Sequence, residues 1–107
     1  MPEVQVVVVG VLRAKSDHVD DVLAGLSAAT EQTHAEEGCV KYTINQVPND
    51  RQRIVIVETW RSRADLEEHF KQPYTLELGK NLGLLEEPPQ IYFLDPVPAG
   101  DDEKGRL

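Results

Sequence analysis

The feature that most constrains this chain is a run of valines near its start, with apolar side chains at almost every position. Residues 4–12 read Val-Gln-Val-Val-Val-Val-Gly-Val-Leu. Side chains of a strand alternate between the two faces of a sheet, so a run without alternation predicts a strand buried on both faces. A second run of this kind, residues 54–57, leads into Glu58-Thr59-Trp60. The sheet that holds these two strands therefore needs cover on each side.

Length and composition indicate one globular domain. The 107 residues suffice for one core, and 40% hydrophobic with 28% charged residues is ordinary for a soluble protein. No apolar stretch approaches the roughly 20 residues of a membrane helix, and Met-Pro-Glu does not resemble a signal peptide. A net charge of -8 argues against a nucleic-acid partner, which needs clustered Lys and Arg. A lone cysteine, Cys39, fits a reducing compartment, so we expect a cytoplasmic protein.

The first half of the chain predicts a strand followed by an amphipathic helix. We expect the strand at about residues 3–13 and the helix to begin near Ser16 or Asp17, either of which could cap it. Positions 19, 22, 23, 26, 29, 30 and 33 carry Val, Val, Leu, Leu, Ala, Thr and Thr, which fall on one arc of a helix. Gly38 could take the left-handed conformation that often follows a helix.

A hairpin is predicted next. Residues 39–47 alternate, with Val40, Tyr42 and Ile44 expected on one face. Pro48-Asn49-Asp50 is a turn signal, and residues 53–60 return as the next strand.

The last third of the chain predicts two helical segments and a strand. Ser62 to Asp65 resembles a capping box, which begins a helix. Pro73 restarts the helix, and residues 74–86 offer a further helical stretch that is weakened by two glycines. Residues 91–94 form a last short strand.

This order of elements predicts an α+β, ferredoxin-like split β-α-β fold with a four-stranded antiparallel sheet. The first and third strands are central in that topology, and here they are the most continuously apolar. Both helical regions cover the same face, which leaves the other face bare. We therefore expect a homodimer whose sheets pack face to face, as a dimeric α/β barrel. Residues 96–107 are expected to form an acidic tail that is flexible or contacts the partner.

Two side chains at the end of the third strand are candidates for the site. Glu58 and Trp60 share a face with Ile54 and Ile56 by strand alternation. A carboxylate in such apolar surroundings is desolvated and can become a general base; alternatively, it ties a helix end or the partner through a hydrogen bond or ion pair. Trp60 is either core or a surface on which a planar substrate stacks.

The second helical region adds a histidine and two aromatic residues. His69 and Phe70 lie on the inward side of the helix, where His69 could remove a phenolic or quinol proton. The alternative is an imidazole held by Asp65 at i, i+4 spacing. Tyr74 could hydrogen-bond the same substrate oxygen or staple the helix break, and Tyr42 is ambiguous in the same way. No pair of potential ligands has metal-site spacing, and no phosphate loop or dinucleotide fingerprint occurs.

Three fragments together resemble the antibiotic biosynthesis monooxygenase (ABM) domain. They are Glu37-Gly38-Cys39-x-x-Tyr42, then Glu58-Thr59-Trp60, then Ala64-Asp65-Leu66-Glu67-Glu68-His69. The resemblance spans roughly residues 4–94, so we assign residues 1–95 to an ABM-like domain. It implies a dimeric α+β barrel in which each subunit holds a pocket between its sheet and its helices.

Several activities are known in that family, and the residues favour one of them. The resemblance implies an axial His late in the second helical region for haem-degrading members, but residues 75–85 contain no His. It also implies a second His at the position where this chain has Tyr74. This difference weakens the interpretation that the protein is a sugar isomerase.

We therefore expect a cofactor-independent monooxygenase of a quinol, an anthrone-like compound or another electron-rich aromatic. Its candidate catalytic residues are His69 and Glu58, and its candidate substrate-binding residues are Trp60, Tyr74, Tyr42 and Phe70. The alternatives are a non-catalytic, stress-associated dimer that sequesters a hydrophobic metabolite, and a cofactor-free isomerase.

Overall fold

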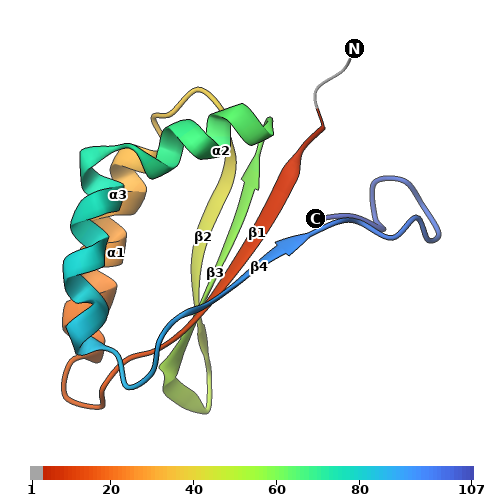
Figure 1. Ribbon diagram of the computed structural model, residues 1–107. Helices are drawn as coiled ribbons and strands as arrows, with labels where there is room; N and C mark the ends of the chain where they lie inside the picture. The colour runs from red at the N-terminus through yellow and green to blue at the C-terminus, as the bar shows by residue number, and fades with distance from the viewer. Residues whose placement is uncertain (1–3) are drawn as a thin grey trace.

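The structure, a computed structural model, describes residues 4–107 and consists of one antiparallel sheet with all helices on one side (Figure 1). The elements are β1 (Val6–Arg13), α1 (Val19–Thr33), β2 (Cys39–Val47), β3 (Asp50–Trp60), α2 (Arg63–Phe70), α3 (Pro73–Glu77), the 3-10 helix η1 (Leu78–Leu84) and β4 (Gln90–Leu94). The strand order β2-β3-β1-β4 places β1 and β3 in the centre. The predicted ferredoxin-like α+β topology is therefore confirmed. Residue 3, where the first strand was expected to begin, lies outside the described residues.

The core lies between the sheet and the helices. The inward face of α1 buries Val22, Leu26, Ala29 and Thr33, as its apolar arc predicts. On the sheet, Ile54 and other side chains of the same face are buried against this arc. Burial of each large aliphatic side chain contributes about 1.5–3 kcal/mol, which exceeds what helix propensity alone supplies. We call this the inner face of the sheet.

The opposite, outer face carries a second set of apolar side chains that no helix covers (Figure 1). Val9, Val11, Val55 and Val57 pair with one another across β1 and β3 and are half-buried. At one end of this face, the tail residues 105–107 border the same hollows as Val7 and Thr59. Val7 and Thr59 are buried at this end of the face. That the tail lies on a partner subunit stays a prediction.

The second helical region follows its capping signals. The backbone N–H of Asp65 donates to the Ser62 hydroxyl at 3.2 Å, and Pro73 occupies the first turn of α3. The helical stretch expected over residues 74–86 is present, but only its first part is α-helical. From Leu78 it continues as the 3-10 helix η1, which contains Gly79 and Gly83. Glycine has a low α-helix propensity, and 3-10 turns are common where an α-helix ends.

The predicted cap of α1 was wrong. His18 is the residue that precedes the helix, and neither Ser16 nor Asp17 caps it. The chain makes a tight turn first, because the His18 N–H donates to the Lys15 carbonyl at 2.9 Å. This turn places both candidate caps before the point where the helix begins.

The predicted place of Val40 was also wrong. Cys39 pairs with Trp60 and Lys41 with Thr59, so Val40 is the extra residue of a β-bulge. It is 46% exposed, whereas Tyr42 remains on the inner face. The bulge shifts the alternation of β2 by one residue.

Gly38 does not adopt the left-handed conformation expected of it, because within residues 4–107 only Gly100 has a positive φ. Glycine is needed at position 38 because another side chain packs closely against its Cα. A Cβ at this position would lie 2.2 Å from Cγ of Asp65. That carboxylate cannot easily move, since Arg61 donates to both of its oxygens at 2.8 and 2.9 Å.

We predict that Gly38→Ala destabilises the protein by about 1–3 kcal/mol, the usual cost of an added methyl group in a packed site. Gly83→Ala is the matched control, because nothing lies within 4 Å of a Cβ there. The control should be unchanged or more stable by up to about 1 kcal/mol, since alanine favours helical conformations. Urea unfolding followed by circular dichroism measures both. Equal stability of the two variants would contradict the steric explanation.

Candidate functional site

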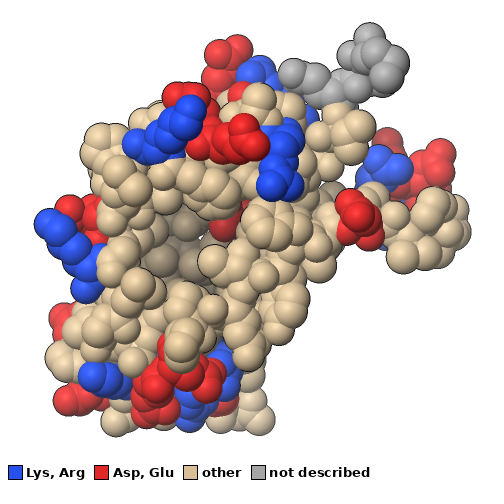
Figure 2. Space-filling model, viewed as in Figure 1, with Lys and Arg blue, Asp and Glu red and all other residues tan. Residues whose placement is uncertain are grey.

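A cavity of about 230 Å³ lies between the inner face of the sheet and the helices. Figure 2 shows it as a hollow in the middle of the view, framed by uncharged side chains. Its lining comes from β1, β2, β3 and β4 on one side and from α1 and the α2–η1 region on the other. The apolar lining residues are Val8, Leu12, Val22, Leu26, Ile56, Phe70, Leu78, Leu82, Leu85, Pro89 and Ile91.

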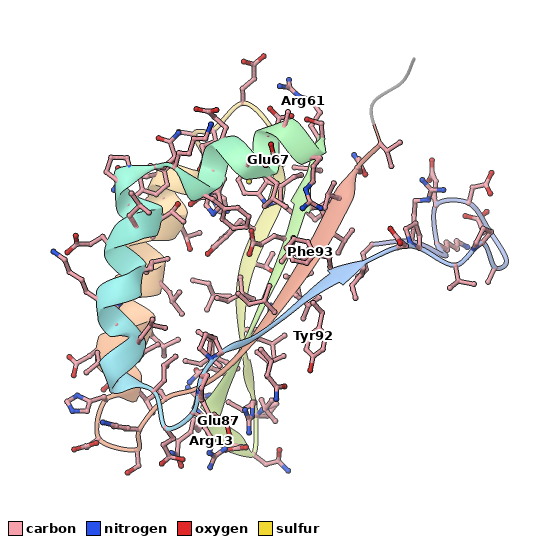
Figure 3. All side chains as sticks on the ribbon, viewed as in Figure 1. Arg13, Arg61, Glu67, Glu87, Tyr92 and Phe93 are labelled. Carbon is pink, nitrogen blue, oxygen red and sulfur yellow. The ribbon has the colours of Figure 1, made fainter. Side chains whose placement is uncertain are left out.

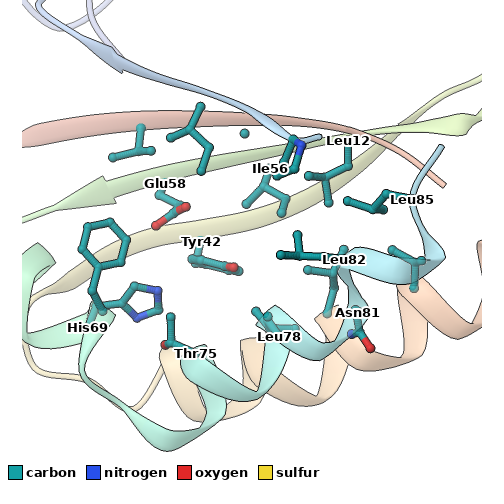
Figure 4. Close-up of a pocket in the computed structure, with 18 residues that line it drawn as sticks. Leu12, Tyr42, Ile56, Glu58, His69, Thr75, Leu78, Asn81, Leu82 and Leu85 are labelled. Carbon is teal, nitrogen blue, oxygen red and sulfur yellow. The ribbon is translucent and has the colours of Figure 1, made fainter. Parts of the chain in front are cut away.

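Most polar groups of the cavity gather toward one end, whereas Asn81 lies among the leucines at the other (Figure 4). Glu58, His69 and Tyr42 lie near one another at the first of these ends, and leucines line the other end (Figure 4). Register explains part of this, because Tyr42 is the cross-strand partner of Glu58 in the β2–β3 pair. The ring centroids of Tyr42 and His69 are 5.8 Å apart. A small molecule in the cavity therefore meets a base, a carboxyl group and a phenol at its polar end.

His69 is held by Glu36 and not by Asp65. The Nδ1 atom of His69 lies 2.8 Å from Oε2 of Glu36, and the imidazole is 3% exposed. Asp65 instead binds Arg61 and Ser62, so the predicted i, i+4 contact was wrong. An ionised carboxylate only accepts hydrogen bonds, so Nδ1 carries the proton in this pair. The free lone pair of a neutral imidazole is then on Nε2.

Tyr74 shares the same carboxylate. Its hydroxyl donates to Oε2 of Glu36 at 2.5 Å. Burial and this hydrogen bond raise the pKa of Tyr74 far above its ordinary value, so it stays a donor. One oxygen of Glu36 thus accepts two hydrogen bonds, which fix its position and that of the His69 ring.

Trp60 contacts two of the polar residues that line the cavity, Glu58 and His69. Its indole N–H donates to Oε1 of Glu58 at 2.9 Å, and its ring centroid lies 4.5 Å from that of His69. Burial raises the pKa of Glu58, although the hydrogen bond from Trp60 and the nearby His69 oppose the shift. Burial likewise raises the pKa of Tyr42. Both groups are therefore harder to ionise than in water.

The structure brings four of the six sequence-predicted residues to the cavity, namely Tyr42, Glu58, His69 and Phe70. Trp60 is fully buried and Tyr74 is half-buried, and neither lines the cavity. In this conformation Trp60 does not contact a molecule in the cavity directly and can influence it only through His69 and Glu58.

Three polar residues of the site were not predicted from the sequence. Thr75 and Asn81 line the cavity, and Glu36 holds His69. Glu36 lies 33 positions before His69, in the stretch interpreted only as the end of a helix. No periodicity or spacing in the sequence links the two, so only the tertiary fold could reveal the pair.

Other kinds of site have less support. Across residues 4–107, no three His, Cys, Asp or Glu side chains gather in a way that could hold a metal ion. In the same part of the chain, no helix has the length and apolar character needed to cross a membrane.

Comparison with known proteins identifies the family. The sequence profile described as "Antibiotic biosynthesis monooxygenase" matches residues 5–79. An uncharacterized Synechocystis protein, sll1783, is 31% identical over 87 residues, which are 80% of this chain and 59% of that protein. This chain thus spans less than two thirds of its relative.

Solved structures share the fold of this chain. Rv0793 from Mycobacterium tuberculosis is 28% identical with a TM-score of 0.83, over 92% of this chain and 100% of that one. PA3566 from Pseudomonas aeruginosa shares the fold, with a TM-score of 0.83 at 22% identity over 92% and 99% of the two chains. On the strength of the profile match, which covers most of its length, this chain belongs to the antibiotic biosynthesis monooxygenase family.

Proposed function

We propose that the protein is a cofactor-independent monooxygenase of a small electron-rich aromatic, such as a quinol or an anthrone-like compound. The observation that carries this proposal is the Glu36–His69 pair at the polar end of an apolar cavity. A buried carboxylate that orients an imidazole is a recurrent arrangement for a general base, because it fixes the tautomer and stabilises the imidazolium.

The first step is proton removal from the substrate. Nε2 of His69 takes a proton from an acidic C–H or O–H, and the positive charge that forms on the ring lies against Glu36. The electron pair of the broken bond stays on the substrate, where the aromatic system delocalises it. Tyr74 keeps Glu36 in place during this step, since it donates to the same oxygen.

The second step uses O2 as the oxidant. The substrate anion transfers an electron to O2, and recombination forms a C–O bond and a substrate hydroperoxide after return of the proton from His69. For an anthrone-like methylene, loss of water then gives the ketone, so the balance is CH2 + O2 → C=O + H2O. The substrate supplies all the reducing electrons, and the protein supplies the base.

The cavity suits small, largely apolar molecules. Its volume of about 230 Å³ is below the range of roughly 300–1,000 Å³ common for drug-sized ligands, which favours compounds of one to three rings. Aliphatic walls exclude bulk water from the anion. The rival function is sequestration of a hydrophobic metabolite, which needs the same walls but no base.

We also propose a homodimer, in which a second copy covers the outer face. Support comes from the half-buried Val9, Val11, Val55 and Val57, which no helix of the same chain covers. A continuous apolar surface of this kind commonly marks a protein interface.

For the proposed reaction, we predict that His69→Gln lowers the rate of O2 consumption with a panel of quinols and anthrones by roughly 10²–10⁴-fold. Glu36→Gln should give a smaller loss, because an amide oxygen can still accept from Nδ1 but carries no charge. An oxygen electrode and the product spectrum measure both. His18→Gln is the control, since that histidine pairs with Asp21 on the surface.

Calorimetric binding of the same compounds separates the rival functions. Loss of turnover with retained binding in the His69 variant supports catalysis. If the parent protein binds the panel but consumes no O2, sequestration replaces the proposed reaction.

For the proposed dimer, we predict that the parent sediments at about twice the 12.0 kDa of one chain. Val57→Lys should sediment near the single-chain mass, because it places a charge in the centre of the outer face. Gln32→Lys, with the same change of charge on the exposed side of α1, should remain dimeric. A parent protein that stays monomeric at the highest attainable concentration would rule out the dimer.

A further inference from the structure

Glu58 and Tyr42 form a second polar group in the cavity, distinct from the His69 base. They are direct partners in the β2–β3 register and point to the same side of the sheet (Figure 4). Both line the cavity. Their placement on two neighbouring strands of the rigid sheet fixes the relative positions of the two side chains.

Each of the two residues has hydrogen-bonding capacity left. The indole of Trp60 occupies Oε1 of Glu58, and within residues 4–107 no hydrogen bond to Oε2 is formed. The Tyr42 hydroxyl likewise forms none with any other described side chain, although the Tyr42 carbonyl accepts one from His34. A bound molecule can therefore use both the free oxygen of Glu58 and the hydroxyl of Tyr42.

The surroundings favour the uncharged form of Glu58. The groups that face it are Glu36, which repels a negative charge, His69, which attracts one when its ring is protonated, and the neutral Tyr42 and Cys39. Burial is the largest effect and raises the pKa of Glu58. In its neutral form a carboxyl group gains an O–H and becomes a donor. A buried carboxylic acid of this kind can bind an oxygen that becomes negative during a reaction.

We propose that Glu58 acts as a neutral hydrogen-bond donor which, together with Tyr42, binds a carbonyl or phenolic oxygen of the substrate. Its role is thus opposite to the base expected from the sequence.

This inference rests on the proposed function and adds the class of molecule to it. The substrate bears an oxygen conjugated to the carbon that loses its proton. When Nε2 of His69 takes that proton, the electron pair of the C–H bond moves toward the oxygen. Hydrogen bonds from Glu58 and Tyr42 then become stronger than in the ground state, which is how such donors lower a barrier.

A pair of bicyclic probes tests the proposal without any turnover. 1-Tetralone carries one ketone oxygen, which only accepts hydrogen bonds, and tetralin is the same ring system without it. Calorimetry at neutral or lower pH should show that the parent protein prefers tetralone by roughly tenfold, the effect of one to two net hydrogen bonds. A preference near one would overturn the proposal.

Variants of Glu58 test whether its O–H group causes the preference for tetralone over tetralin. Glu58→Gln should keep it, because an amide has an N–H at the same place, whereas Glu58→Met should lose most of it. Tyr42→Phe should lose part, and it serves as a second test if the Met variant does not fold. Equal preferences in the Gln and Met variants would also overturn the proposal.

The pH dependence of the preference tests whether the neutral form of Glu58 is the one that binds tetralone. As pH rises through the raised pKa of Glu58, the parent protein should lose its preference for tetralone, because a carboxylate cannot donate. The Gln variant should show no such loss. His69→Gln should keep the preference while it strongly lowers O2 consumption. A failure of the proposed reaction therefore leaves this test intact, and the two proposals can fail separately.

Stability provides an independent check on the neutral form. Because the folded-state pKa of Glu58 is raised above the ordinary 4.5, the folded protein keeps a proton that the unfolded chain has already lost. The free energy of unfolding should therefore fall as pH rises from about 4.5 through the raised pKa. Glu58→Gln should remove this part of the slope in urea unfolding, and an unchanged slope would count against the neutral form.

Discussion

The site depends on one carboxylate oxygen. Oε2 of Glu36 accepts from His69 in α2 and from Tyr74 in α3, and Glu36 itself lies just beyond the end of α1. One acceptor thus joins three helical segments and sets the direction of the imidazole. Burial raises the pKa of Glu58, and the negative charge of Glu36 adds a smaller contribution in the same direction. The same group therefore orients the imidazole of His69 on one side of the cavity and, less strongly than burial, disfavours ionisation of Glu58 on the other.

The sheet determines how the remaining groups meet. Because β1 and β3 are central, their inner-face side chains lie in the middle of the molecule, and the cavity forms where the helices do not fill the space above them. Arg13 binds Asp50 and Glu86, and Arg53 binds Glu87. Arg13 and Glu87 lie at the same end of the molecule (Figure 3). These ion pairs hold the segment before β4 at the leucine-lined end. The polar end is held by hydrogen bonds, from Trp60 to Glu58 and from His69 and Tyr74 to Glu36.

Much of the fold could be predicted from the sequence because its signals are local. The double-sided apolar runs identified the central strands, and the arc of α1 identified its buried face. Apart from the cap of α1, which a local turn at Lys15–His18 decides, predictions failed where a contact distant in sequence decides the local structure. The close packing at Gly38 depends on Asp65, and the bulge at Val40 depends on pairing with β3. The partner of His69 comes from a loop 33 residues earlier in the chain. Strand alternation placed Glu58 in the site, but its role depends on neighbours that spacing does not reveal.

The contact between Trp60 and His69 has a practical consequence. The chain contains a single tryptophan, and its ring lies 4.5 Å from the imidazole and 2.9 Å, by its N–H, from Glu58. A protonated imidazole quenches indole emission, and a change in the carboxyl group alters the polarity that the indole senses. We therefore expect the fluorescence of the unlabelled protein to respond to changes at both cavity residues through one chromophore, so that events in the site can be followed in real time.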